Sequence, residues 1–316
     1  MRKPLFLAAP ARLALPLVLA VSLTWLSGCQ TAPSAPTKPQ APVVISAPPP
    51  VVAPRAPPKP PRIGLALGGG AARGFAHIGV IQVLEAAGIQ PDLVVGTSAG
   101  SLVAALYASG KNGAELETLA LTMDEGAITD WAFPSRGLIR GEALARFVRD
   151  QTAGQGIEQM KRPLGIVATD LDSGAGVLFQ RGDVGTAVRA SSSVPAVFHP
   201  VKIGDREYVD GGLVAPVPVR YARQMGAELV LAVDISSPPD GQATSDTMKL
   251  LLQTFAIMGK SINRFELRDA DVVVRPPLVG VSSADFTSRV RAIRSGRDAA
   301  TEMLPALRAR IAALTK

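Results

Sequence analysis

Short apolar runs alternate along the chain with longer segments in which apolar residues recur every three or four positions. The run Ile63–Leu67 comes first, and residues 75–87 after it have helical spacing that ends before Gly88. Residues 93–95 form a second apolar run, and the small apolar residues 102–106 follow it as a second helical segment. Strands joined to helices through glycine-rich turns, in this order, are typical of an α/β fold with a parallel sheet.

The same alternation continues to the C-terminus, and no proline-rich break divides residues 63–316. Further strands are predicted at 164–168, 177–179, 208–209, 228–235 and 271–274, with the second of these as the hairpin partner of the first. Further helices are predicted at 184–191, 247–268 and 290–314. We therefore expect residues 63–316 to form one domain.

The first 28 residues have the composition of a secretory leader. A positively charged start precedes the apolar stretch 13–26, and small residues then lead to Cys29, the single cysteine of the chain. The motif Leu-Ser-Gly-Cys resembles the bacterial lipobox, in which the leader is removed before a cysteine that becomes lipidated. We expect residues 1–28 to be a lipoprotein signal peptide and Cys29 to anchor the protein to a membrane of the bacterial cell envelope. Gln30 after the cysteine favours the outer membrane, and an uncleaved signal anchor is the alternative.

Residues 29–62 are expected to form a disordered tether between that anchor and the domain. Twelve of the 32 residues from 31 to 62 are proline, which removes backbone donors and fixes φ, so helix and sheet are excluded there. Such a segment samples extended polyproline conformations. The segment is either a spacer that holds the domain away from the membrane or a disordered remnant whose length has no function.

Charge gives no support to a nucleic-acid partner. The chain has a formal net charge of +7, but seven of its 33 basic residues lie in residues 1–62, which contain no acid. The 26 basic residues that remain are balanced by 26 acidic residues, so the domain has no bulk positive charge. The single cysteine also excludes an intrachain disulfide.

The first glycine-rich turn, "GGGAARG", follows the strand Ile63–Leu67 and runs from Gly68 to Gly74. A dinucleotide-binding fingerprint requires glycine at the sixth position from Gly68, where this chain has Arg73, and the Gly-Lys-Ser/Thr of a phosphate loop is absent from the sequence. What remains is a glycine backbone that opens a helix, with N–H groups free to face a negative charge. A tight turn that needs glycine only for positive φ is the alternative.

The second turn, Gly-Thr-Ser-Ala-Gly, places Ser98 between a strand and a helix. This is the pattern of a nucleophile elbow, in which a strained turn lifts the serine hydroxyl above the sheet edge and small neighbours let backbone approach backbone. The N–H of Ala99, at the helix start, can then donate to the oxyanion that attack by Ser98 creates. The motif alone is frequent by chance, but it gains weight beside a second helix start that offers donors.

Three groups are candidates for the base that activates Ser98. His77 precedes the serine, contrary to the α/β-hydrolase order, and we expect it to make a local polar contact. His199 follows the serine but lies before a proline in the apolar context "SSVPAVFHPV", which is typical of a packed loop histidine. Asp210, in "DGG" after a short strand, can reach across as a carboxylate base, and burial would raise its pKa toward neutrality. An Asx turn without a catalytic role is the alternative for Asp210.

Three motifs, "GGGAARG", "GTSAG" and "DGG", occur in this order, together with "ALGGGAARGFAHIGVIQVLE", "ASSSVPAVFHPV" and a closing "FTSRVRAIRSGRDAA". They resemble the patatin-like phospholipase family over nearly all of residues 63–316. The resemblance implies a three-layer α/β/α fold with a mostly parallel central sheet, and a Ser98–Asp210 dyad without histidine. It also implies an oxyanion hole formed by the backbone of Gly68, Gly69 and Gly70. Arg73 matches a family position near that loop, with an electrostatic or a structural role.

The residues and the resemblance together predict a serine acyl hydrolase that cleaves ester bonds of lipids. Ser98 attacks the acyl carbonyl, Asp210 takes its proton and returns it to the leaving alcohol, and water clears the acyl-enzyme. No cofactor is expected, and the sequence contains no clustered Asp/Asn loop of calcium-binding spacing. The expected partners are a lipid or other acyl ester and the membrane that holds Cys29.

Three expectations stay open at this point. Residues 124–139, with Trp131 and Phe133, are a candidate lid, but both aromatic residues fit a core equally well. A histidine-based esterase that uses Ser98 and His199 is an alternative mechanism. A non-enzymatic envelope lipoprotein that retains the fold as a binding or scaffold module is an alternative function.

Overall fold

The computed structural model of the chain describes residues 58–128, 130, 136–236, 246–281 and 286–316. The predicted signal peptide, Cys29 and nearly all of the predicted tether lie outside the described residues, as do Trp131 and Phe133 of the candidate lid. Among the helices within the described ranges, none combines the length and the apolar character needed to cross a bilayer.

One mixed sheet runs through the domain. Its strands are β1 (Ile63–Leu67), β2 (Leu93–Thr97), β3 (Leu164–Asp170), β4 (Gly176–Phe179), β5 (Val201–Ile203), β6 (Arg206–Asp210), β7 (Leu229–Val233) and β8 (Val272–Val274). The strand order is β5-β6-β3-β2-β1-β7-β8, with β4 also paired to β3. The five strands from β3 to β8 in that order are parallel, whereas β4 and β6 run antiparallel to β3, and β5 runs antiparallel to β6. The mostly parallel sheet expected from the sequence is confirmed.

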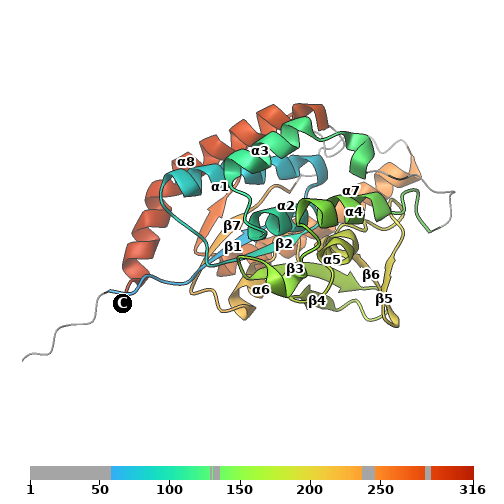
Figure 1. The fold of residues 1–316 in the computed structure, drawn as a ribbon, viewed down its shortest axis with the longest axis horizontal. Coiled ribbons are helices and arrows are strands. Elements are labelled where there is room, and N and C mark those ends of the chain that lie inside the picture. Colours follow the sequence, from blue (N-terminus) through green and yellow to red (C-terminus); the bar gives the residue numbers. More distant parts are fainter. Residues whose placement is uncertain (1–57, 129, 131–135, 237–245, 282–285) are drawn as a thin grey trace, which may run out of the picture. The chain divides into compact units, whose positions relative to one another are not determined.

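Helices cover both faces of this sheet. They are α1 (Ala76–Ala86), α2 (Ala99–Ala108), α3 (Gly113–Thr122), α4 (Glu142–Gln151), α5 (Val184–Ser191), α6 (Val219–Gln224), α7 (Thr247–Glu266) and α8 (Arg289–Leu314). Figure 1 shows α1, α3 and α8 along one side of the sheet and α6 on the other. The fold is therefore the three-layer α/β/α arrangement that the sequence analysis expected.

Strand β1 shows why the apolar runs are continuous. Leu65 and Leu67 pack in the core shared with α1 and α8, whereas Ala66 between them packs in the core shared with α6. Alternate side chains of a strand point to opposite faces, so a strand covered on both faces needs apolar residues at every position.

Two helices that close one face touch through glycine. A Cβ on Gly79 of α1 would lie 2.0 Å from the carbonyl oxygen of Ile293, and a Cβ on Gly296 of α8 would lie 2.0 Å from that of Ala76. Only glycine permits so close an approach. The C-terminal helix is thereby locked over the β1–α1 unit, which carries the first glycine-rich turn.

Some elements differ from the expectation. The helix predicted at 75–87 begins as a 3-10 segment, Ala71–Phe75, before α1, and Ala71 has a φ of 48°. The sequence pattern does not predict α3, α4, α6 and β5. Each has ten residues or fewer, so its apolar positions repeat too few times for periodicity to identify it.

Candidate active site

Ser98 lies in the turn between β2 and α2 with a strained backbone. Its φ of 53° and ψ of −124° fall in a region that residues with a side chain rarely adopt. A Cβ on Gly96 would lie 2.3 Å from the carbonyl oxygen of Gly100, and a Cβ on Gly100 would lie 2.1 Å from that of Leu67. The two glycines of Gly-x-Ser-x-Gly are therefore required by backbone contact, as expected for a nucleophile elbow.

Neighbouring elements hold this turn in place. The N–H of Ser98 donates to Oγ of Ser191 at 2.9 Å, and Ser191 Oγ itself donates to the carbonyl of Val167 in β3 at 2.5 Å. Thr97 Oγ1 donates to the carbonyl of Ala215 at 2.9 Å. A strained backbone conformation persists only where neighbouring groups hold it in place, and these three hydrogen bonds hold the turn at Ser98. Ser191 lies within "ASSSVPAVFHPV", but only its position in space identifies it as a support of Ser98.

The pairing of β3 brings Asp210 to this turn. Val167 pairs with Thr97 of β2 on one edge of β3 and with β4 on the other. Ala168 also pairs with β4, so its second partner, Asp210 of β6, lies on the edge that β2 has just left. Strands β2 and β6 thus end head to head, and Ser98 and Asp210 follow at the meeting point. A Cβ on Gly211 would lie 3.2 Å from Thr97 Cγ2, in agreement with this contact.

The carboxyl of Asp210 is buried and only half satisfied. Asp210 is 6% exposed, and its Oδ1 accepts a hydrogen bond from the N–H of Gly212 at 2.6 Å. Its Oδ2 has no hydrogen-bond partner in the part of the chain that the structure describes. Burial raises the pKa of Asp210 from 3.8 to about 6, and the Gly212 N–H and the nearby Ser98 side chain offset part of that rise. The Asx turn considered from the sequence is present, but it uses one carboxylate oxygen and leaves the other without a partner among the described residues.

The main chain at Asp210 is fixed on both sides. Its N–H donates to the carbonyl of Ser193 at 2.9 Å, and Thr169 Oγ1 donates to its carbonyl at 2.8 Å. The carboxyl is therefore held at the end of β6 by β3 and by the segment that follows α5.

The first glycine-rich turn lies against Ser98. A Cβ on Gly69 would lie 3.1 Å from Ser98 Cβ. The N–H of Gly68 donates to the carbonyl of Val233 at 3.0 Å, and the N–H of Gly69 donates to the carbonyl of Pro216 at 2.9 Å. Two of the predicted oxyanion donors are thus engaged in backbone hydrogen bonds.

Two predicted donors stay available. The N–H of Gly70 has no acceptor in the part of the chain that the structure describes. The N–H of Ala99 is in the first turn of α2, where the helix itself offers no acceptor. Together they leave two amides near Ser98 for a ligand oxygen.

Two basic residues near this turn have structural contacts. His77 is fully buried, and its Nε2 donates to the carbonyl of Gly68 at 2.8 Å, which is the local polar contact expected for it. Burial lowers the pKa of His77 to about 4, so the ring is neutral. The buried guanidinium of Arg73 donates to the carbonyl of Ser236 at 2.8 Å. Arg73 thereby ties the glycine-rich turn to the segment after β7.

His199 makes its described contact through the backbone. Its N–H donates to the carbonyl of Ile139 at 2.9 Å, and its buried Nε2 has no hydrogen-bond partner from the described segments. No hydrogen bond within the described ranges joins His199 to Ser98 or Asp210. In the candidate lid, the N–H groups of Leu138 and Ile139 donate to the carbonyl of Val197, so the end of that segment is attached to the same loop.

A metal site is not indicated by the described residues. No group of three or more His, Cys, Asp or Glu side chains in those ranges is arranged to hold an ion.

We predict that the support of Ser98 by Ser191 has a measurable free energy. Ser191→Ala leaves the Ser98 N–H and the Val167 carbonyl without their partner, and should lower the free energy of unfolding by about 1–3 kcal/mol. Urea denaturation provides the measurement. Ser193→Ala is the matched control, since Ser193 Oγ donates only to the carbonyl of Arg189. Equal effects of the two substitutions would contradict a special role for Ser191.

Comparison with known proteins identifies the family of this chain. The family model for patatin-like phospholipases matches residues 65–223. An uncharacterised NTE family protein of Mycobacterium tuberculosis is 38% identical over 186 residues, which cover 58% of this chain and 51% of that protein. Patatin-like phospholipase domain-containing protein 6 of Mus musculus is 35% identical over 184 residues, covering 55% of this chain and 14% of that protein.

The fold also agrees with a solved structure. VipD from Legionella pneumophila has a TM-score of 0.54 at 15% identity, over 79% of this chain and 68% of that chain. The chain spans about half the length of the bacterial relatives that it matches. With its family-model match over half of its length, this chain belongs to the patatin-like phospholipase family.

Proposed function

We propose that this protein is a lipid acyl hydrolase in which Ser98 is the nucleophile and Asp210 the general base. One observation carries the proposal: a strained serine turn and a buried carboxylate with a free oxygen meet where β2 and β6 end head to head. Membership of the patatin-like phospholipase family supports lipid esters as the class of substrate.

The proposed reaction has two halves. Ser98 Oγ attacks the ester carbonyl while its proton passes to Oδ2 of Asp210, and the leaving alcohol then takes that proton. Water, deprotonated by the same carboxylate, next attacks the acyl-serine; the bond to Ser98 Oγ breaks, Asp210 returns the proton to that oxygen, and the fatty acid is released. The amides of Gly70 and Ala99 donate to the oxyanion in each half, because those of Gly68 and Gly69 are already bound.

The environment of Asp210 suits this role. A carboxylate with a pKa of 3.8 is a weak base at neutral pH, whereas a pKa of about 6 is closer to the operating pH and still leaves the group ionised. A scaffold module has no need of a buried ionised carboxylate beside a strained serine, since both lower stability. The contacts of the two histidines favour the dyad over a histidine-based esterase. Nε2 of His77 is bound to Gly68, and no described hydrogen bond joins His199 to Ser98.

We also propose that the domain works at the cell envelope of a bacterium, held there by lipidated Cys29 and the proline-rich tether that follows. The support is the sequence of the first 62 residues: a charged start, an apolar stretch, Leu-Ser-Gly-Cys and then 12 prolines among residues 31–62. Gln30 favours the outer membrane.

The dyad predicts a pattern of reactivity. A fluorophosphonate should label the wild-type protein and not Ser98→Ala. Asp210→Asn should lower hydrolysis of a soluble monomeric ester by a factor of about 10² to 10⁴, the usual range for loss of a general base. His199→Ala is the control and should stay close to wild type. Absence of labelling in the wild type would contradict the enzymatic function, and loss of activity in His199→Ala with retention in Asp210→Asn would replace the dyad by the histidine mechanism.

Asp210 predicts opposite effects of pH on rate and on stability. The base must be ionised, so kcat/KM should fall as pH drops through about 6. The folded pKa exceeds the unfolded value of 3.8, so the stability contributed by the protonated carboxyl is full below pH 3.8 and lost as pH rises through about 6. Asp210→Asn, which imitates the neutral acid, should therefore be more stable than wild type by up to about 3 kcal/mol at pH 8. Urea denaturation at pH 5 and pH 8 tests this, and a difference that does not grow with pH would contradict the buried, ionised carboxylate.

Lipidation predicts a labelled cysteine. Bacteria grown with a clickable fatty acid should incorporate it into the wild-type chain, and detergent but not salt should extract that chain from membranes. Cys29→Ser should take up no label. Equal labelling of both chains, or none in the wild type, would contradict the anchor.

A further inference from the structure

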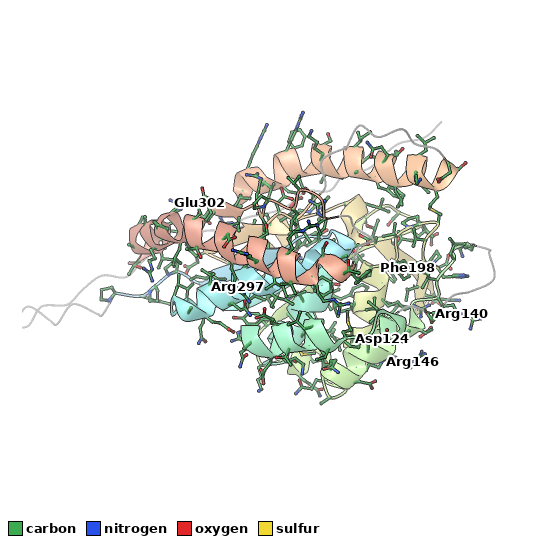
Figure 2. All side chains as sticks on the ribbon, turned by 90° about the horizontal axis from the view of Figure 1, so that it is seen from above. Asp124, Arg140, Arg146, Phe198, Arg297 and Glu302 are labelled. Atoms are coloured by element: carbon green, nitrogen blue, oxygen red, sulfur yellow. The ribbon has the colours of Figure 1, made fainter. Side chains whose placement is uncertain are left out.

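Helix α7 presents an apolar face that the domain does not cover. Leu250, Ile257, Met258 and Phe265 are all exposed, and Phe265 is 65% exposed. Their spacing of seven, one and seven residues places them on one face of the helix. Figure 2 shows α7 along one edge of the molecule, with side chains that stand free on its outer side. Asn263 and Glu266 are the buried positions of the helix.

This helix is attached to the candidate active site. A Cβ on Gly259 of α7 would lie 3.5 Å from Cγ of Pro216, an ordinary packing contact. The carbonyl of Pro216 accepts the hydrogen bond from Gly69, the glycine that lies against Ser98. Helix α7 therefore packs, through the side that carries Gly259, against the segment that binds the glycine-rich turn, and its apolar face lies on the side away from that contact.

A basic cavity of about 370 Å³ opens at the C-terminal half of α7. Its cationic lining consists of Lys260, Arg264, Arg268 and Arg275. Asp234 also lines it, but its carboxylate is 3.3 Å from Nε of Arg275. Neither Lys260 nor Arg264 has an acidic partner within the described ranges. The cavity therefore carries positive charge that the described protein leaves uncompensated.

A buried amide faces the same cavity. Asn263 lines it and is only 4% exposed, yet neither its Oδ1 nor its Nδ2 has a hydrogen-bond partner among the described residues. Buried polar groups in native proteins are nearly always paired, and leaving an amide unpaired is unfavourable. The amide can donate Nδ2–H to an anionic oxygen while Oδ1 accepts from a hydroxyl or a water. A phosphate ester offers the oxygens, and the surrounding cations offer the charge-assisted bonds that phosphate prefers.

We propose that this cavity binds the phosphate of an anionic phospholipid, and that the exposed apolar face of α7 lies in the bilayer surface that presents it. An apolar face next to basic residues is the composition of an interfacial helix, and anionic lipids attract such basic groups. The inference deepens the proposed function by naming the surface on which the lipid is held. One part of the inference rests on the proposed function: that the class of lipid bound here is also the class of lipid hydrolysed.

The cavity and the glycine-rich turn share a wall. Asp234 and Ser236 line the cavity, and the residue between them, Ile235, lies against Gly70, where a Cβ would be 2.8 Å from Ile235 Cδ1. Arg73 of the turn donates to the carbonyl of Ser236. A phosphate bound in the cavity would thus be held beside the turn that faces Ser98.

Fluorescence on lipid vesicles tests the proposal with the full-length chain. Every variant carries Cys29→Ser and Ser98→Ala, so neither lipidation nor hydrolysis contributes. An environment-sensitive fluorophore is attached at Met258→Cys on α7 or, as the control, at Glu302→Cys on α8, which Figure 2 labels. Vesicles of phosphatidylcholine with phosphatidylglycerol should shift the Met258→Cys fluorophore to the blue and leave the Glu302→Cys fluorophore unchanged. An equal response at both sites, or an equal response to phosphatidylcholine alone, would overturn the proposal.

Further variants distinguish the effect of net charge on vesicle binding from the effect of the cavity itself. Lys260→Glu with Arg264→Glu should weaken binding to the anionic vesicles at least tenfold. Arg294→Glu with Arg308→Glu, an equal change of charge on exposed positions of α8, should weaken it far less. Asn263→Leu changes no charge and should still weaken binding severalfold, without a lower thermal midpoint. No effect of Asn263→Leu would overturn the cavity as the binding site.

The source of the phosphate and the link to catalysis are distinguished by the same proteins. Saturable binding of inorganic phosphate that Asn263→Leu abolishes, without any response of the α7 fluorophore to vesicles, would overturn the bilayer as the source. Hydrolysis of a soluble ester by the chain with Ser98 restored reports on the proposed function alone. Intact hydrolysis without vesicle binding would therefore overturn only this inference.

Discussion

The sharing of one edge of β3 by two strands is the constraint on which the site depends. Strand β2 occupies that edge as far as Val167, and β6, running the other way, occupies it from Ala168 onward. Neither strand can extend without displacing the other, so β2 and β6 must both leave the sheet at the same place. The turn after β2 carries Ser98, and the last residue of β6 is Asp210. Their proximity is a consequence of backbone pairing and does not require a long loop to bring one side chain to the other.

This arrangement retains two features that lower stability. Ser98 has a positive φ, and Asp210 has a pKa raised to about 6 because its carboxyl is removed from water. Both persist because neighbouring groups hold them: Ser191 binds the Ser98 N–H, and Thr169 binds the Asp210 carbonyl. In the proposed reaction, a serine already held in this turn and a carboxylate already removed from water would need little reorganisation when an ester binds.

The first glycine-rich turn connects this centre to the outer surface. On one side Gly69 touches Ser98, and on the other the turn binds Pro216, which supports α7, and Ser236, which lines the basic cavity. The proposed hydrolysis requires a lipid to move from a bilayer to the half-buried Ser98. In this protein one turn borders the serine and is bonded to Pro216, which packs against α7, and to Ser236, which lines the cavity with Asn263. Binding at the surface and reaction at the serine would then share one rigid support.

The sequence by itself determined the local features of the protein, namely its buried strands and its glycine-rich turns. Continuous apolar runs predicted the buried strands. Gly-x-Ser-x-Gly predicted the turn at Ser98, because a Cβ on Gly100 would lie 2.1 Å from the carbonyl oxygen of Leu67 and only glycine fits there. The tertiary structure alone decided which partners meet. The support from Ser191 spans 93 positions, and the amides of Gly68 and Gly69 are engaged by Val233 and Pro216. The oxygen of Asp210 and the amide of Asn263 that lack partners among the described residues exist only once the chain is packed. Hydrogen-bond partners and burial depend on residues distant in the chain, and no local pattern of side chains records them.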